Sequence, residues 1–213
     1  LFGTALLFSA IAILPWTIRN SIQMDAPALI STNGGINFWI GNNPEATGRY
    51  WFPQDGPLNT EAFKGEAERD REGYRLGMEF ILQHPVDALS LIPRKIYYLI
   101  GDDTSGAYWA TTELERSLPL LSQWALVSIS KYYYFAIITL AVMSLALLGE
   151  WRRHPGVVLL LTLAYWVALH VVFFGSDRFH FPLVPFLAIA ATGVIPLATI
   201  GYKSIQLKVR GWA

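Results

Sequence analysis

The sequence predicts an α-helical integral membrane protein with about four transmembrane helices and a mixed, mainly helical external segment. Two observations lead to this fold class. The last third of the chain contains three apolar stretches of membrane-spanning length, in which His170 is the only ionisable residue apart from tyrosines. A helix of about 20 residues crosses the hydrocarbon core, and these stretches lack the polar face that a soluble amphipathic helix shows about every 3.6 residues.

The composition supports the same class. Hydrophobic residues make up 53% of the chain and aromatic residues 14%, and the mean hydropathy is +0.36. The chain has no cysteine, which excludes disulfides, zinc–thiolate sites and cysteine nucleophiles. Its formal net charge is +0, so no overall field attracts nucleic acid.

Four spans are predicted in chain order. Residues 1–15 form an apolar run without the basic start and small-residue cleavage site of a signal peptide, and we interpret them as a truncated transmembrane helix in the C-terminal part of a longer protein. Residues 132–149, 156–175 and 181–202 form a three-span bundle. Residues 203–213 form a tail.

The positions of basic residues predict the orientation. The link after the second span and the tail together carry five basic residues (Arg152, Arg153, Lys203, Lys208 and Arg210) and one acidic residue. The positive-inside rule places both segments in the cytoplasm. Alternation then places residues 16–131 and 176–180 outside, although the long segment carries 10 basic and 14 acidic residues, because long loops escape the rule.

The long external segment begins with a region rich in turn formers, residues 31–48, which we expect to form a compact loop. Asn59 or Thr60 is predicted to cap a helix that runs to about Gln83, with a charged, solvated face.

Residues 86–100 are apolar but short for a span, and we interpret them as an interfacial or re-entrant helix with Arg94 and Lys95 near the headgroups. Residues 117–129 are predicted to form a second interfacial helix.

Three ionisable residues at the outer ends of the predicted spans are candidates for phosphate binding: Arg19, Arg178 and His180. The guanidinium group of arginine matches phosphate oxygens two at a time, so this cluster suits a lipid-linked phosphate. The alternative is that these residues reach ordinary lipid headgroups or pair with Asp177.

His170 lies inside the third span. It is either a hydrogen-bonded histidine of the bundle or a proton relay and substrate contact. Asp102 and Asp103 follow Gly101, and they are either paired carboxylates for metal or acid–base chemistry or, as is typical of this pattern, part of a turn. No catalytic carboxylate is predicted from spacing. No metal-binding, nucleotide-binding or hydrolase motif occurs.

Two sequence elements resemble a known family. Residues 14–20 (Leu-Pro-Trp-Thr-Ile-Arg-Asn) with residues 31–44 (Ser-Thr-Asn-Gly-Gly-Ile-Asn-Phe-Trp-Ile-Gly-Asn-Asn-Pro), and residues 177–186 (Asp-Arg-Phe-His-Phe-Pro-Leu-Val-Pro-Phe), are similar to segments of bacterial polyprenyl-phosphate-sugar glycosyltransferases. These enzymes belong to the dolichyl-phosphate-mannose protein mannosyltransferase-like superfamily of GT-C fold, which includes aminoarabinose transferases. His84-Pro85 followed by Lys95 also matches a helix of this group.

The resemblance implies an inverting glycosyltransferase of the bacterial-type plasma membrane with its long loop outside the cytoplasm. The donor would be a polyprenyl-phosphate sugar, and the acceptor a lipid, glycan or protein. The catalytic aspartate of the family lies upstream of the residues present here, so the fragment would be inactive alone. The resemblance implies no cofactor, and it is compatible with the use of a divalent metal ion.

The resemblance assigns residues to two roles. Arg178, His180 and Arg19 match motifs that would bind the donor phosphate, and for Arg19 a scaffold role is the alternative. Five loop residues are candidates for acceptor contact or for a scaffold role: Asn33, Asn37, Trp39, Asn42 and Asn43. Aromatic faces stack on sugar rings, so Trp39, Tyr50 and Trp51 either cover an acceptor or pack the loop.

Two other functions are weighed against the enzyme. A transporter or flippase of lipid-linked sugars would carry charged or broken helices near the membrane midplane and internal repeats, and the sequence shows neither. A non-catalytic membrane scaffold would use the external segment as a binding module.

Overall fold

The computed structural model of the chain describes residues 2–59, 63–112, 118–147 and 154–195. The α-helices, in chain order, are α1 (Phe2–Gln23), α2 (Gly34–Gly41), α3 (Glu66–Gln83), α4 (Pro85–Ile100), α5 (Ser105–Thr112), α6 (Leu120–Leu147), α7 (His154–Val172) and α8 (Val184–Ala191). Two 3₁₀ turns, η2 (Asp177–Phe179) and η3 (Phe181–Leu183), precede α8. No β-strand occurs within these ranges, which confirms the prediction of a mainly helical fold.

The chain divides into two compact units. Unit 1 comprises Leu1–Lys95 and Val171–Gly175, and unit 2 comprises Ile96–His170 and Ser176–Ala213. Two of the three boundaries fall within helices, since α4 and α7 each contribute residues to both units, and the third lies between α7 and η2.

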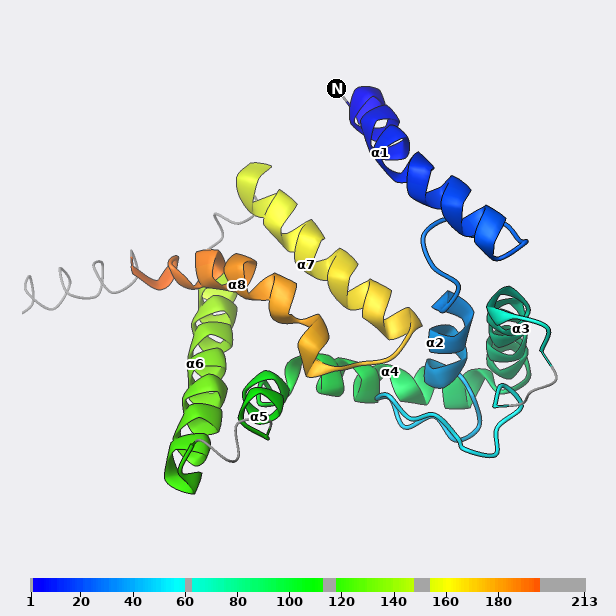
Figure 1. Cartoon of the computed structure of the whole chain (residues 1–213). Helices are drawn as coiled ribbons and strands as arrows, with labels where there is room; N and C mark the ends of the chain where they lie inside the picture. The colour runs from blue at the N-terminus through cyan, green and yellow to red at the C-terminus, as the bar shows by residue number, and fades with distance from the viewer. Residues whose placement is uncertain (1, 60–62, 113–117, 148–153, 196–213) are drawn as a thin grey trace, which may run out of the picture. The chain divides into compact units, whose positions relative to one another are not determined.

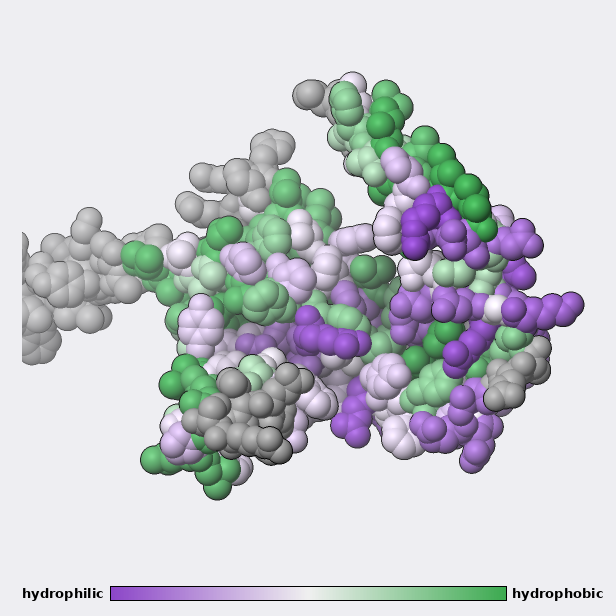
Figure 2. Space-filling view, viewed as in Figure 1, coloured by the Kyte–Doolittle hydropathy of each residue, from purple (hydrophilic) through white to green (hydrophobic). Residues whose placement is uncertain are grey.

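Two helices are long and apolar enough to cross a membrane: residues Gly3–Gln23 of α1 and Leu120–Ala146 of α6. Only 6% of the most apolar part of α1 and 11% of that of α6 are buried, whereas the core helix of a soluble protein is mostly buried. Exposed Leu, Ile and Phe side chains give α1 a continuous apolar surface (Figure 2). Length, composition and exposure therefore fit helices whose surroundings are lipid.

The other two predicted spans do not reach this length among the described residues. The apolar part of α7, Gly156–Val172, is shorter than a typical span. The described part of the fourth span contains only η3 and α8, and residues 196–202 lie outside the described residues. Arg152, Arg153 and the tail, on which the predicted orientation depends, also lie outside them.

Two predicted boundaries in the apolar helices are wrong. Helix α1 continues through Pro15 to Gln23 instead of ending at residue 15. The predicted interfacial helix 117–129 and the second span form one continuous helix, α6, which begins directly after Pro119. No glycine or proline interrupts α6, so nothing in the sequence breaks the helix between its polar first turns and its apolar part.

The predicted compact loop at residues 31–48 contains a helix, α2. Glycine at both ends of α2 permits close packing: a Cβ at Gly35 would lie 1.8 Å from the carbonyl oxygen of Asp70 in α3, and one at Gly41 would lie 1.7 Å from that of Phe173. Helices α2 and α3 therefore lie side by side in direct backbone contact (Figure 1). Gly35 and Gly41, which the sequence analysis attributed to turns, instead allow this close backbone contact.

Helix α3 begins at Glu66, not near Asn59 or Thr60 as predicted. Gly65 precedes it with extended backbone angles (φ 178°, ψ 173°), which ends any helix arriving from the N-terminal side. Thr60 lies outside the described residues. The charged run is solvated only in part: Glu66, Glu68 and Arg71 are exposed, whereas Arg69, Asp70 and Glu72 are half-buried. Asp70 accepts the amide N–H of Gly35 (2.6 Å), and Arg75 pairs with Glu72 and Glu79 at one-turn spacing.

Helix α4 starts at Pro85, where the missing N–H costs no helical hydrogen bond, and runs through Pro93 as one helix.

The core of unit 2 lies between α6, α7 and the segment from η3 into α8. Its buried members come from all three segments and are Tyr134, Ala141, Leu159, Leu183, Leu187 and Ala190. Small residues at Ala141 and Ala190, each fully buried, let α6 and α8 approach closely. This core fixes the end of η3, and so fixes the turn that precedes it.

Candidate functional site

The segment between α7 and α8 forms two consecutive 3₁₀ turns, and we call residues 176–183 the Arg178 turn. The amide N–H of Phe179 donates to the carbonyl of Ser176 (3.0 Å), that of His180 to Asp177 (3.0 Å), and that of Leu183 to His180 (2.7 Å). Pro182 lies in the second turn, where a fixed φ suits a helical start. The turn therefore has a defined backbone.

His180 is the most completely buried polar residue of this turn, with 0% of its surface exposed. Its Nδ1 lies 2.6 Å from the carbonyl oxygen of Leu99, and its Nε2 lies 3.1 Å from Oδ1 of Asp103. Its ring stacks on that of Tyr134, with centroids 4.3 Å apart and planes at 15°. Both nitrogens thus have partners within the chain, and neither is directed toward an outside ligand.

The partners of His180 define its protonation. A carbonyl oxygen only accepts, so Nδ1 carries the hydrogen that it donates to Leu99. Nε2 then either donates to an ionised Asp103 or accepts from a protonated one. In both cases one hydrogen lies between Nε2 and the carboxyl group, and this contact joins the Arg178 turn to the 100–103 segment.

Asp103 is a residue of the site that the sequence interpretation missed. Ser130 of α6 donates to its backbone carbonyl (2.6 Å), and Tyr134 donates to the carbonyl of Ile100 (3.0 Å), so α6 holds the 100–103 segment at two points. Asp102 behaves as predicted for a turn, accepting from the amide of Asp103 (3.0 Å) and the hydroxyl of Thr104 (2.8 Å). The Gly-Asp-Asp pattern was visible, but its partner is 77 residues away.

Asp177 makes a second link between the same two segments. Its Oδ2 accepts the amide N–H of Ser105, the first residue of α5, at 3.0 Å. Its Oδ1 accepts the amide of Arg178 at 2.9 Å. Burial alone would raise the pKa of Asp177, but the hydrogen bonds from Ser105, Arg178 and Ser176 outweigh it and hold this pKa below its usual value. Asp177 is therefore a capping carboxylate of α5.

Arg178 lies between these two anchored residues and is exposed. Its guanidinium group lies over the ring of Phe179, 4.9 Å from the centroid, and among the described residues no carboxylate pairs with it. The expected pairing with Asp177 does not form, because the carboxylate of Asp177 accepts backbone N–H groups instead. The turn thus presents one unpaired guanidinium group.

His170, the proposed relay, contacts this turn through an aromatic ring. Its Nδ1 lies 2.8 Å from the carbonyl of Trp166, and its ring centroid lies 4.9 Å from that of Phe179. Trp166 also donates its indole N–H to the carbonyl of Phe179 (2.7 Å). The hydrogen bond of His170 goes to a backbone carbonyl, not to a second titratable group, so the geometry favours a role in packing Phe179.

Arg19 belongs to unit 1 and is exposed near the end of α1. Its Nη1 donates to Oδ1 of Asn20 (2.9 Å), and its guanidinium group lies 4.9 Å from the ring centroid of Trp16. Three other side chains near the end of α1 bind the backbone of residues 29–30, where the chain passes back along the helix. Trp16 and Asn20 donate to the carbonyl of Ile30 (3.2 and 2.7 Å), and Thr17 donates to that of Leu29 (2.6 Å).

The candidate acceptor residues lie in and around α2 and are mostly inaccessible. Asn33 precedes the helix and accepts from the hydroxyl of Ser31 (2.6 Å), and Asn37 is half-buried in its middle. Trp39 is buried, with its ring centroid 5.8 Å from that of Phe52. Tyr50 and Trp51 are the exposed aromatic residues of this segment, so they are better placed to meet a sugar than Trp39.

Asn42 and Asn43 end α2 from inside the fold. Asn43 donates to the carbonyls of Trp39 (2.9 Å) and Ile40 (3.2 Å) at the helix end, where the carbonyl of Trp39 also accepts the amide N–H of Asn42 (2.9 Å). Asn42 donates to the carbonyls of Phe38 (2.8 Å) and Val172 (2.9 Å). Both side chains are buried and fully engaged, which supports the scaffold alternative for them.

Lys95 is buried beside Asn42. Its ammonium group donates to Oδ1 of Asn42 (2.9 Å) and to the carbonyl of Val171 (3.0 Å), and among the described residues no carboxylate pairs with it. Burial lowers the pKa of Lys95 to about 8. The expectation that Lys95 reaches the headgroups does not fit this position, because only 2% of its surface is exposed.

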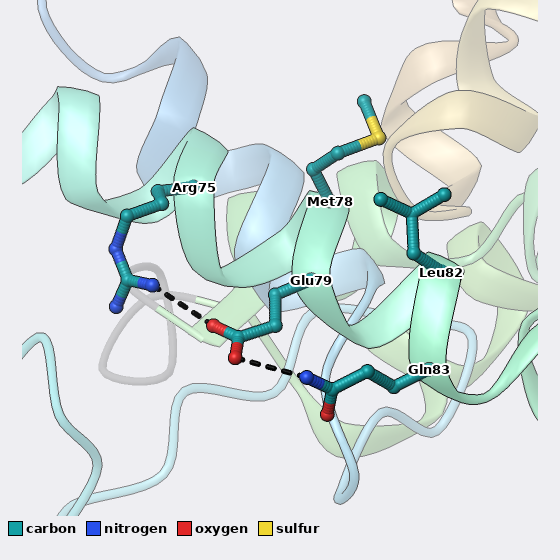
Figure 3. A pocket seen from close by; sticks show the side chains of 5 residues that line it. All are labelled: Arg75, Met78, Glu79, Leu82 and Gln83. Atoms are coloured by element: carbon teal, nitrogen blue, oxygen red, sulfur yellow. Dashed lines mark hydrogen bonds and ion pairs between the residues drawn. The ribbon is translucent and has the colours of Figure 1, made fainter.

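A shallow hollow of about 360 Å³ lies on one face of α3 and is lined by Arg75, Met78, Glu79, Leu82 and Gln83 (Figure 3). The carboxylate of Glu79 accepts from Arg75 (2.9 Å) and Gln83 (3.0 Å), while Met78 and Leu82 point to the same side of the helix. Every charged group here has a partner on the same helix, so the hollow offers no reactive group. Among the described residues no group of three acidic or histidine side chains is placed to hold a metal ion.

Comparison with known proteins gives no match: no protein-family model, no curated protein and no solved structure is similar to this chain.

Proposed function

We propose that this chain is part of a membrane glycosyltransferase that moves a sugar from a polyprenyl-phosphate donor to a lipid, glycan or protein acceptor. In this proposal four helices span a bacterial-type plasma membrane, and the long segment and the Arg178 turn lie on the external face. The sequence resemblance suggests the reaction. The observation that carries the site is the exposed, unpaired guanidinium group of Arg178 on a turn with a defined backbone.

The chemistry of the reaction fits such a group. When the sugar leaves a polyprenyl phosphate, negative charge grows on the phosphate oxygens. A guanidinium group held at that place stabilises the growing charge without reorganising. Its planar fork can donate two parallel hydrogen bonds to one phosphate, which a lysine cannot. The two membrane-length helices supply apolar surface for the polyprenyl tail.

The structure supports some of the residues predicted to bind the donor phosphate better than others. Arg178 has the exposure that a phosphate ligand requires, whereas His180 has both nitrogens engaged inside the fold. We therefore propose Arg178 as the donor-phosphate residue. Arg19 is exposed and stays a second candidate.

The test uses the full-length protein that contains this chain, purified in lipid. A radiolabelled polyprenyl-phosphate sugar is added, and release of polyprenyl phosphate is followed for wild type, Arg178→Ala, Arg178→Lys and Arg75→Ala. Loss of one such donor costs about 10²- to 10³-fold in turnover, so Arg178→Ala should fall by that factor and Arg178→Lys should recover part of it. Arg75→Ala is the matched control, since Arg75 is an exposed arginine paired on α3.

Near wild-type turnover in a folded Arg178→Ala protein would remove Arg178 from the mechanism. Absence of release with every donor tested would argue against the transferase. Exchange of labelled donor across vesicle membranes without any glycosidic product would instead indicate transport.

A further inference from the structure

We propose that Asp103 and His180 form a positioning pair that holds the Arg178 turn so that the guanidinium group faces a phosphate. The inference rests on the proposed function, because it assigns a role within the same site. It changes the role of His180 from phosphate contact to support, and it adds Asp103, which no sequence motif suggested.

Two carboxylates link the 99–105 segment to the Arg178 turn, one contributed by each segment. Asp103 of the first segment contacts Nε2 of His180, and Asp177 of the turn accepts the amide of Ser105. Arg178 follows Asp177 directly and lies two residues before His180, so its backbone is fixed on both sides.

His180 is completely buried and stacked on Tyr134, so it can change orientation only by losing the ring contact and both hydrogen bonds. A buried polar group without partners is costly, so the pair is either intact or the turn moves. The contact between Asp103 and His180 therefore holds the Arg178 turn in one stable conformation.

The carboxylate of Asp103 is engaged with Nε2 of His180, so it is not a competing partner for Arg178. Removing the imidazole would leave an uncompensated carboxylate near the turn, which would attract the guanidinium group and repel a phosphate. The Asp103–His180 pair thus holds Arg178 in position and leaves its guanidinium group free to bind a phosphate.

The experiment measures Arg178 directly in the full-length protein in lipid. An arginine-specific dicarbonyl reagent modifies exposed guanidinium groups, and polyprenyl monophosphate is added as the protecting ligand. Modification of Arg178 is followed by mass spectrometry in wild type, Asp103→Ala, Asp103→Asn and His180→Ala. Asp102→Ala is the matched control, because Asp102 makes only contacts within its own turn.

We expect polyprenyl monophosphate to protect Arg178 in wild type and in Asp102→Ala. Protection should be lost in Asp103→Ala and His180→Ala although Arg178 is present, and it should be retained in Asp103→Asn, which still forms a hydrogen bond with Nε2. The value of kcat/KM should fall about 100-fold in the two alanine variants, as for a displaced catalytic group. Protection equal to wild type in folded Asp103→Ala or His180→Ala would overturn the inference.

Hydrogen exchange separates this inference from the proposed function. The amides of Phe179 and His180 should exchange at least about tenfold faster in Asp103→Ala and His180→Ala than in Asp102→Ala. Unchanged exchange would refute the positioning role by itself. If exchange accelerates but wild-type Arg178 is not protected by polyprenyl monophosphate, the pair holds the turn as argued and the phosphate role of Arg178 is what fails.

Discussion

The contact between α2 and α3 gives the sharpest test of the fold, through the substitution Gly73→Ala. A Cβ at Gly73 would lie 2.4 Å from the carbonyl carbon and oxygen of Gly35 and 2.8 Å from the amide nitrogen of Ile36. All three atoms belong to the backbone of α2 and cannot turn aside. Because ordinary contacts of a Cβ begin near 3.4 Å, the two helices must separate by about 1 Å.

The expected loss of stability follows from opposing terms. Overpacking of this kind costs about 1–3 kcal/mol, and separation also stretches the hydrogen bond from the amide of Gly35 to Oδ1 of Asp70 (2.6 Å), worth about 1 kcal/mol. Alanine in place of a helical glycine recovers about 1 kcal/mol. The free energy of opening the α2–α3 pair should therefore decrease by about 2 kcal/mol.

Native-state hydrogen exchange of the α2 and α3 amides measures this quantity. A decrease of about 2 kcal/mol accelerates exchange by about 30-fold, since about 1.4 kcal/mol is tenfold. Gly77→Ala should cost less, because its nearest atom belongs to the ring of Phe38, which can tilt. Gly106→Ala in α5 is the control, as no atom lies within 4 Å of its added Cβ. Exchange in Gly73→Ala as slow as in wild type would refute the packing described here.

Two further predictions concern pH. The pKa of Lys95 is about 8 in the fold and 10.5 in the unfolded chain, so the unfolded chain binds more protons between these values. The free energy of unfolding should therefore rise by up to about 3 kcal/mol between pH 8 and 10.5, and Lys95→Met should abolish this rise in pH-dependent melting. Asp177→Asn should destabilise the start of α5 by about 1 kcal/mol at neutral pH, measured by exchange of α5 amides. Because the pKa of Asp177 is lowered in the fold, that difference should vanish on acidification below its ordinary value of 3.8.

Sequence patterns identified the apolar helices because hydrophobicity over 20 residues is a local signal. Helices α1 and α6 lie where apolar runs were seen, and α3 and α4 meet at His84 and Pro85 as expected. The boundaries differed where the sequence carries no break. Helix α6 absorbs a predicted separate helix, since no glycine or proline divides residues 120 to 147.

The error at residues 31–48 has a different cause. Glycine permits both tight turns and close helix contacts, and local sequence does not separate the two uses. The use at Gly35 becomes evident only when Asp70 of α3 lies against it, which is a tertiary contact. The pairing of Asp103 with His180 was missed for the same reason, because a single aspartate and a single histidine far apart in sequence form no periodic pattern.

The motifs that contain Arg19 and Arg178 are built alike: neighbouring side chains hold the backbone, and the arginine side chain is exposed. In the first, Trp16, Thr17 and Asn20 donate to the backbone carbonyls of Leu29 and Ile30, and the side chain of Arg19 is exposed.

In the Arg178 turn, the contacts of Asp177 and His180 fix the backbone, and the side chain of Arg178 between them is exposed. Each guanidinium group lies 4.9 Å from the centroid of a neighbouring aromatic ring, that of Trp16 or that of Phe179. Stacking occupies the face of the guanidinium plane and leaves N–H donors at its edge for an oxygen ligand. A lysine at either position would keep the charge and lose the plane, so Arg→Lys exchange distinguishes recognition of a phosphate from general attraction to an anionic surface.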